Sequence, residues 1–109
     1  MSVVKAMRAY QEEKLNCAQS VLRGFQERYA IQEEQITAAK QLGGGKAENG
    51  LCGALYAASL LADDTLKKKL NEHFIVEAGS DKCREIRACG KLSCGECVEL
   101  AARVLHDRQ

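Results

Sequence analysis

Apolar residues recur along the chain at steps of three and four positions, which is the spacing of one face of an α-helix. Three stretches carry the clearest stripes, separated by polar positions. The stripes are Leu15, Ala18, Leu22, Phe25 and Tyr29; Leu51, Ala54, Leu55, Ala58 and Leu61; and Cys94, Cys97, Val98, Ala101, Val104 and Leu105. No stretch shows the strict alternation that is typical of a β-strand. The pattern therefore predicts amphipathic helices.

Glycines and helix-capping residues divide these stripes into seven predicted helices. The breaks fall at residues 43–50, 62–64, 79–80 and 90. The expected helices span residues 3–14, 16–30, 32–41, 51–61, 64–78, 81–88 and 94–107, and the first two can also be read as one continuous helix. The predicted fold class is all-α, a compact bundle of about five to seven short helices with no sheet.

Composition indicates the cellular compartment of the protein and argues against nucleic-acid binding and a membrane span. The 109 residues predict a single domain spanning 1–109, and the absence of proline fits a helical chain. A net charge of +1 provides no basic field for nucleic acid. No stretch approaches the roughly 18 apolar residues of a membrane span, and charged residues interrupt the N-terminal segment where a secretory signal would need an apolar run. We therefore expect a cytoplasmic protein.

Six cysteines are the most unusual feature of this composition. Stable disulfides are rare in the reducing cytoplasm, so this number of cysteines favours metal binding or redox chemistry. Cys89, Cys94 and Cys97 have the C-x4-C-x2-C spacing with which plant-type ferredoxins bind a [2Fe–2S] cluster, with a distant fourth cysteine. The fourth ligand here would be Cys83, Cys52 or Cys17. Since ferredoxin ligands lie on a loop of a β-rich fold, the spacing supports a cysteine-ligated centre rather than a ferredoxin fold.

Four of the cysteines follow residues that commonly cap helices. Ser93 and Glu96 form a capping box around Cys94, and Ser80 with Asp81 precedes Cys83. Asn49-Gly50 precedes Cys52, and Asn16 precedes Cys17. We therefore expect Cys17, Cys52, Cys83 and Cys94 in the first turns of helices, where free backbone N–H groups and the helix dipole lower a thiol's pKa. If these helix starts converge, they form a pocket suited to anionic sulfur.

Glycines and histidines are weaker candidates for the site. The segment "GGGKAENG" lacks the P-loop spacing and is best explained as a helix C-cap and connection. Its bare backbone can approach a cluster closely, so Gly43, Gly44, Gly45 and also Gly53 are candidate cofactor-binding residues. His73 and His106 are far along the chain from most of the cysteines, and a surface or packing role is expected for both.

Five segments in one order carry a resemblance to a known family. They are "NCAQSVL" at 16–22, "LGGG" at 42–45, "CGALYA" at 52–57, "GSDKCREI" at 79–86 and "CGECVELAA" at 94–102. The chain resembles, over about residues 15–105, the family of redox-active proteins named for its C-GCAxxG-C-C cysteine pattern. The family's four characteristic cysteines map onto Cys17, Cys52, Cys83 and Cys94, with Cys89 and Cys97 outside the pattern. Ala57 stands where the family motif ends in glycine.

The resemblance implies redox activity without naming a reaction. The family also resembles the non-haem part of split-Soret cytochromes, for which an iron–sulfur centre has been suggested. The leading hypothesis is a redox protein whose cysteines hold an iron–sulfur or other metal centre and pass electrons to a partner protein. One alternative is a thiol–disulfide exchanger in which Cys94 or Cys97 attacks. Another is a structural helical module in which zinc or plain packing explains the sulfur. Whether the protein is an enzyme, and whether it forms a homodimer, stay open.

Overall fold

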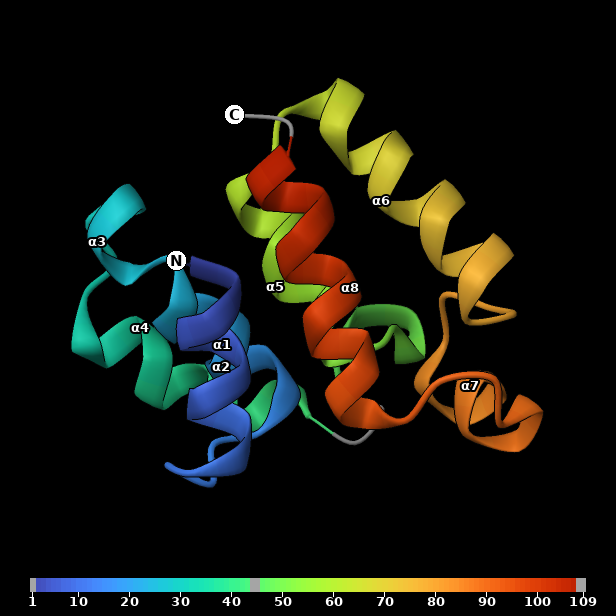
Figure 1. Cartoon of the computed structure of the whole chain (residues 1–109), viewed down its shortest axis with the longest axis horizontal. Coiled ribbons are helices and arrows are strands. Elements are labelled where there is room, and N and C mark those ends of the chain that lie inside the picture. Colours follow the sequence, from blue (N-terminus) through green and yellow to red (C-terminus); the bar gives the residue numbers. More distant parts are fainter. Residues whose placement is uncertain (1, 44–45, 108–109) are drawn as a thin grey trace.

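The computed structural model describes residues 2–43 and 46–107, and these residues form an all-helical protein (Figure 1). No β-strand occurs within these ranges, where the only sheet-like pairing is one isolated bridge between Leu51 and Lys82. The elements, in chain order, are α1 (Ser2–Gln11), α2 (Cys17–Gly24), α3 (Gln26–Tyr29), α4 (Glu33–Ala38), the 3-10 helices η1 (Ala39–Leu42) and η2 (Glu48–Gly50), α5 (Gly53–Leu61), α6 (Asp64–Glu77), α7 (Cys83–Cys89) and α8 (Cys94–Asp107). The predicted all-α class is confirmed.

Two of the predicted helices are interrupted. The expected helix at 16–30 divides into α2 and α3 at Phe25, whose φ of −107° and ψ of 13° leave the helical range. The expected helix at 32–41 ends as an α-helix at Ala38 and continues as a 3-10 helix. The first two predicted helices are not continuous either, because Lys14 has a φ of 59° and Asn16 then caps α2. The apolar stripe from Leu15 to Tyr29 crosses the break at Phe25, so its spacing did not reveal that break.

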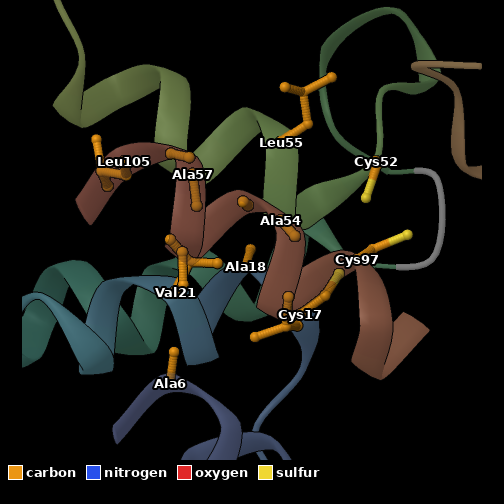
Figure 2. Packing of buried hydrophobic residues seen from close by; sticks show 14 of the residues in the cluster. Ala6, Cys17, Ala18, Val21, Cys52, Ala54, Leu55, Ala57, Cys97 and Leu105 are labelled. Carbon is orange, nitrogen blue, oxygen red and sulfur yellow. The ribbon is translucent and has the colours of Figure 1, made fainter. Parts of the chain in front are cut away.

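The core forms where α2 packs against α1, α5 and α8. Small residues allow these helices to approach closely: a Cβ on Gly24 would lie 2.6 Å from the Cβ of Ala6 on α1. Figure 2 shows the buried alanines of α2 and α5 among larger side chains from α8, with Cys17, Cys52 and Cys97 at one end of this cluster. Burial of this apolar surface is the main stabilising contribution, at roughly 25 cal/mol per Å². The core therefore ends in a group of sulfur atoms.

Ala57, which replaces the family glycine, belongs to this core. It is fully buried on α5, and it does not line the cysteine cavity described below. The replacement therefore affects helix packing and leaves the walls of that cavity unchanged.

The helices of the described residues are too short or too polar to span a bilayer. The longest, α6 and α8, each have 14 residues.

Candidate functional site

Five of the six cysteines line one cavity of about 370 Å³. They come from four segments that are far apart in the sequence: the start of α2, the start of α5, α7 and the first turn of α8. The full lining consists of Cys17, Cys52, Cys83, Ile86, Arg87, Gly90, Leu92, Ser93, Cys94, Glu96 and Cys97. The structure thus brings together the four cysteines of the family pattern and adds Cys97.

Cys17 is held by a capping box at the start of α2. The Asn16 side chain accepts a hydrogen bond from the Gln19 backbone N–H at 2.8 Å, and the Gln19 side chain accepts from the Asn16 N–H at 3.1 Å. The Asn16 amide also donates to the Lys40 carbonyl at 2.9 Å. Such a cap satisfies two of the free N–H groups at the helix start. Cys17 is therefore the first residue of α2, as predicted, and its position is also tied to η1.

Cys52 lies one residue before its helix. It is itself the N-cap of α5, whose first helical residue is Gly53. The Cys52 N–H donates to the Asp81 carbonyl at 2.9 Å, and the adjacent bridge joins Leu51 to Lys82. The expected capping by Asn49-Gly50 is wrong, because Asn49 adopts a left-handed conformation within η2. Pairing with the segment before α7, rather than a side-chain cap, places Cys52 beside Cys83.

Cys83 is the first residue of α7, but its cap differs from the prediction. Lys82 occupies the N-cap position without a side-chain cap hydrogen bond. Ser80 lies further back: its hydroxyl accepts from the Lys82 N–H at 3.0 Å and donates to Glu85 at 2.6 Å. Ser80 therefore forms hydrogen bonds at the start of α7, but it lies two residues before the N-cap and is not itself the N-cap.

Cys94 and Cys97 lie in the first turn of α8. Ser93 and Glu96 form the predicted capping box, with the Ser93 N–H donating to the Glu96 carboxylate at 2.8 Å and the Glu96 N–H donating to the Ser93 hydroxyl at 3.1 Å. Cys97 is 2% exposed, whereas Cys94 is only partly buried. The C-x-x-C pair therefore spans the cavity from its interior to its open side.

The thiols in the cavity interior interact with one another and hold their protons tightly. Hydrogen bonding with the Cys52 thiol, together with burial, raises the pKa of Cys17 far above its ordinary value. The interaction with Cys17 lowers the pKa of Cys52, but hydrogen bonding with Cys97 and burial outweigh it and raise the value to about 12. Burial also raises the pKa of Cys83, although the charge of Arg87 opposes the change. The expectation of lowered thiol pKa values is wrong for these three cysteines, because desolvation and neighbouring sulfur outweigh the helix dipole.

A cation and a phenol lie beside Cys94. The Arg87 guanidinium Nη2 donates to the Cys94 Sγ at 3.8 Å. Tyr10 of α1 also interacts with Cys94; burial, then this neighbouring sulfur, raises the pKa of its phenol. The ring of Tyr10 packs against Gly95, where a Cβ would lie 3.3 Å from the ring. Cys94 is therefore the cavity thiol in contact with the one arginine among the lining residues.

Several sequence candidates lie outside the cavity. Cys89 is exposed at the end of α7, and a Cβ on Gly79 would lie 2.8 Å from its sulfur. The C-x4-C-x2-C spacing thus does not place all three of its cysteines on one cavity. Neither histidine lines the cavity: His73 pairs with Glu77 at 2.9 Å, and His106 contacts Arg28 at 3.2 Å.

The glycine candidates divide three ways. Gly53 does not line the cavity, but a Cβ there would lie 2.6 Å from the Cys17 sulfur, so this glycine makes room for a cavity thiol. Gly43 packs against the Asn16 side chain and is the C-cap of η1, with an extended conformation. Gly44 and Gly45 lie outside the described residues. Of the two described glycine candidates, Gly53 is therefore the one next to a cavity cysteine.

The donor set suits a thiolate-ligated centre. Four cysteine thiolates are the common ligand set of iron–sulfur clusters and of structural zinc sites. Across residues 2–43 and 46–107, however, no three Cys, His, Asp or Glu side chains are already arranged to hold a metal ion. The chemistry of the residues therefore fits such a group, while ligation would require the thiols to turn toward a common point.

Three side chains of the cavity wall other than cysteine were not predicted from the sequence. Arg87, Ile86 and Leu92 belong to the short segment around α7. A helical step of four from Cys83 to Arg87 would have placed the two side chains on one face. Tyr10 had no comparable signal, because its proximity to Cys94 depends on how α1 packs against α8.

Comparison with known proteins identifies a family for this chain. The family described as "Putative redox-active protein (C_GCAxxG_C_C)" matches residues 15–108, nearly the whole chain. No curated protein and no solved structure matches the chain. The chain therefore belongs to this C_GCAxxG_C_C family.

Proposed function

We propose that Cys17, Cys52, Cys83 and Cys94 hold an iron–sulfur or other thiolate-ligated metal centre that exchanges electrons with a partner protein. The observation that carries this proposal is the convergence of these cysteines on one cavity, although they come from four separate segments. Packing alone does not require sulfur from each of these segments at one place. Cys97, on the interior wall, would be a neighbouring thiol or an exchangeable ligand.

The raised thiol pKa values describe the cavity without a bound cation. Several thiolates in one buried cavity repel one another, so the metal-free protein keeps Cys17 and Cys52 protonated. A bound metal ion reverses this balance, because its positive charge stabilises the thiolates and displaces their protons. Cys17 and Cys52, in the interior of the cavity, are therefore poor nucleophiles at neutral pH.

The chain's own residues would bind, shield and tune the centre. Ile86 and Leu92 contribute apolar walls that limit access of water, and Arg87 provides a positive charge beside Cys94. When bound, an iron–sulfur centre supplies one-electron transfer at a potential set by its charge, burial and hydrogen bonds. The hydrogen bond from Arg87 to Cys94 would favour the more negative, reduced form of the centre.

A thiol–disulfide exchanger is the second candidate, and the contact between Arg87 and Cys94 favours it. In this reaction the partly exposed Cys94 thiolate attacks a substrate disulfide and forms a mixed disulfide, releasing one substrate thiolate. Cys97, one turn later, then attacks the Cys94 sulfur, which releases the second thiolate and leaves a Cys94–Cys97 disulfide. The substrate gains two electrons and the protein loses two.

Anaerobic reconstitution separates the candidates. The reduced protein is incubated with ferrous iron and sulfide, desalted, and assayed for iron, acid-labile sulfide and visible absorption. We expect iron and sulfide to be retained, and to be lost on Cys17→Ser, Cys52→Ser, Cys83→Ser or Cys94→Ser. Cys89→Ser is the matched control, because Cys89 lies outside the cavity. Retention of zinc alone would favour a structural site. A colourless protein with a reversible Cys94–Cys97 disulfide would support the exchanger.

A further inference from the structure

We infer that a basic hollow beside the cysteine cavity is the docking surface for an acidic redox partner protein. The hollow has a volume of about 610 Å³, and its cations are Lys82, at the N-cap of α7, and Arg84 and Arg87 on that helix. The inference rests on the proposed function, since it assigns the place where electrons enter or leave. The identity of the partner is limited to its chemistry: a protein that presents a cluster of carboxylates around its own redox centre.

The hollow and the cysteine cavity share two residues. Cys83 and Arg87 line both, so the wall between them is one short helix, α7. A protein seated over the hollow would lie directly against Cys83, a proposed ligand of the centre. Its position therefore gives the partner a short route to the sulfur site.

The charge of the hollow is positive and available to a partner. Lys82, Arg84 and Arg87 are all exposed, and Glu85 is the single carboxylate among the lining residues. Glu85 accepts a hydrogen bond from the Ser80 hydroxyl at 2.6 Å. Within the described part of the chain, Arg84 and Arg87 form no ion pair, and Lys82 pairs only with neighbouring Asp81, at 3.7 Å. By contrast, Lys5 and Arg23 elsewhere on the surface pair with glutamates.

A protein fits this surface better than a small anion. The cations stand on an exposed surface, and the cavity's buried side chains are thiols and apolar groups rather than a cradle of polar donors. Figure 1 shows α7 at the edge of the molecule, where its outer side is not covered by another helix. Electron-transfer partners form small interfaces, and complementary charge mainly accelerates their encounter. A cationic rim around a redox cavity meets both requirements.

The test compares two charge-neutralised variants with equal net charge. The first carries Lys82→Gln and Arg84→Gln. The control carries Lys67→Gln and Lys68→Gln, which are exposed on the first half of α6, away from α7 in Figure 1. Binding of an acidic flavodoxin, used as the probe, is followed by ¹⁵N chemical shifts on reduced, metal-free protein at low ionic strength. Because no metal centre is needed, the result is independent of whether the proposed function is correct.

We expect the shifts to map onto residues 82–91, and the affinity of the first variant to fall about tenfold while the control changes less than about twofold. Raising the ionic strength to about 0.15 M should weaken binding of the unmodified protein more than that of the first variant. Equal loss in both variants, or shifts centred elsewhere, would overturn the inference. Full displacement of the flavodoxin by inorganic phosphate at constant ionic strength would instead identify a small-anion site and would also overturn it.

Discussion

Gly53, the first residue of α5, lies next to the Cys17 sulfur. The substitution Gly53→Ala therefore tests how tightly the residues around the cavity are packed. An added Cβ would lie 2.6 Å from the Cys17 Sγ and 2.9 Å from the Leu42 carbonyl oxygen. Both distances are shorter than van der Waals contact, and the carbonyl belongs to the backbone, which cannot rotate away like the end of a long side chain. Accommodating alanine therefore requires α5 and the start of α2 to move apart.

The expected cost follows from two opposing contributions. Alanine favours the helical conformation over glycine by at most about 1 kcal/mol, and less at the first helical residue. Overpacking a filled core costs about 1–3 kcal/mol. The net expectation is a loss of about 1–2 kcal/mol in the free energy of unfolding, which corresponds to a fall of very roughly 4–10 °C in Tm for a domain of this size.

Urea unfolding of the reduced, metal-free protein measures this loss. The same substitution in a Cys17→Ala background provides a double-mutant cycle. We expect Gly53→Ala to cost about 1 kcal/mol less in that background, because the sulfur clash is removed while the clash with Leu42 stays. Unchanged or increased stability of Gly53→Ala in the parent chain would refute this account of the packing.

Three further predictions concern the cysteine cavity and the helix cap beside Cys17. Asn16→Ala should lower the free energy of unfolding by about 1–2 kcal/mol, because it removes the α2 cap and the bond to Lys40, and a loss below about 0.5 kcal/mol would contradict that role. The pKa of Cys52 is raised to about 12 in the folded protein, so its contribution to stability should be complete below its unfolded value of about 8.5 and decline as the pH rises toward 12. Urea unfolding from pH 8 to 10 should therefore show a shallower decline in Cys52→Ala than in the parent, and identical slopes would count against the raised pKa. A short pulse of iodoacetamide, followed by mass spectrometry, should label the exposed Cys89 before the buried Cys17, Cys52 and Cys97, whereas equal labelling would show that the cavity is open.

The fold class and the cysteine set could be predicted because each depends on local sequence. Apolar stripes give the helices, and the capping box at Ser93 and Glu96 gives the exact start of α8. The ordered family motifs then identify four cysteines that share the cavity. The helices and the capping box depend on residues three or four positions apart, so both can be recognised in the sequence.

Tertiary contacts determined what could not be predicted. The break at Phe25 lies inside a continuous apolar stripe, so periodicity gave no sign of it. The thiol pKa values depend on how closely Cys17, Cys52 and Cys97 approach one another, and no single helix start contains that information. Spacing also grouped Cys89 with Cys94, although Cys89 is exposed, lies near Gly79 and does not line the cavity.

The convergence of distant cysteines is the claim on which the proposed function depends, and arsenite tests it most directly. Arsenite is a small three-coordinate reagent that joins neighbouring thiols, and the joined cysteines are identified by their protection from alkylation in the folded, reduced protein. We predict one arsenic per chain, with Cys17 and Cys52 protected together and Cys89 alkylated. Alkylation of Cys17 and Cys52 at the rate of Cys89, with no arsenic bound, would contradict the account.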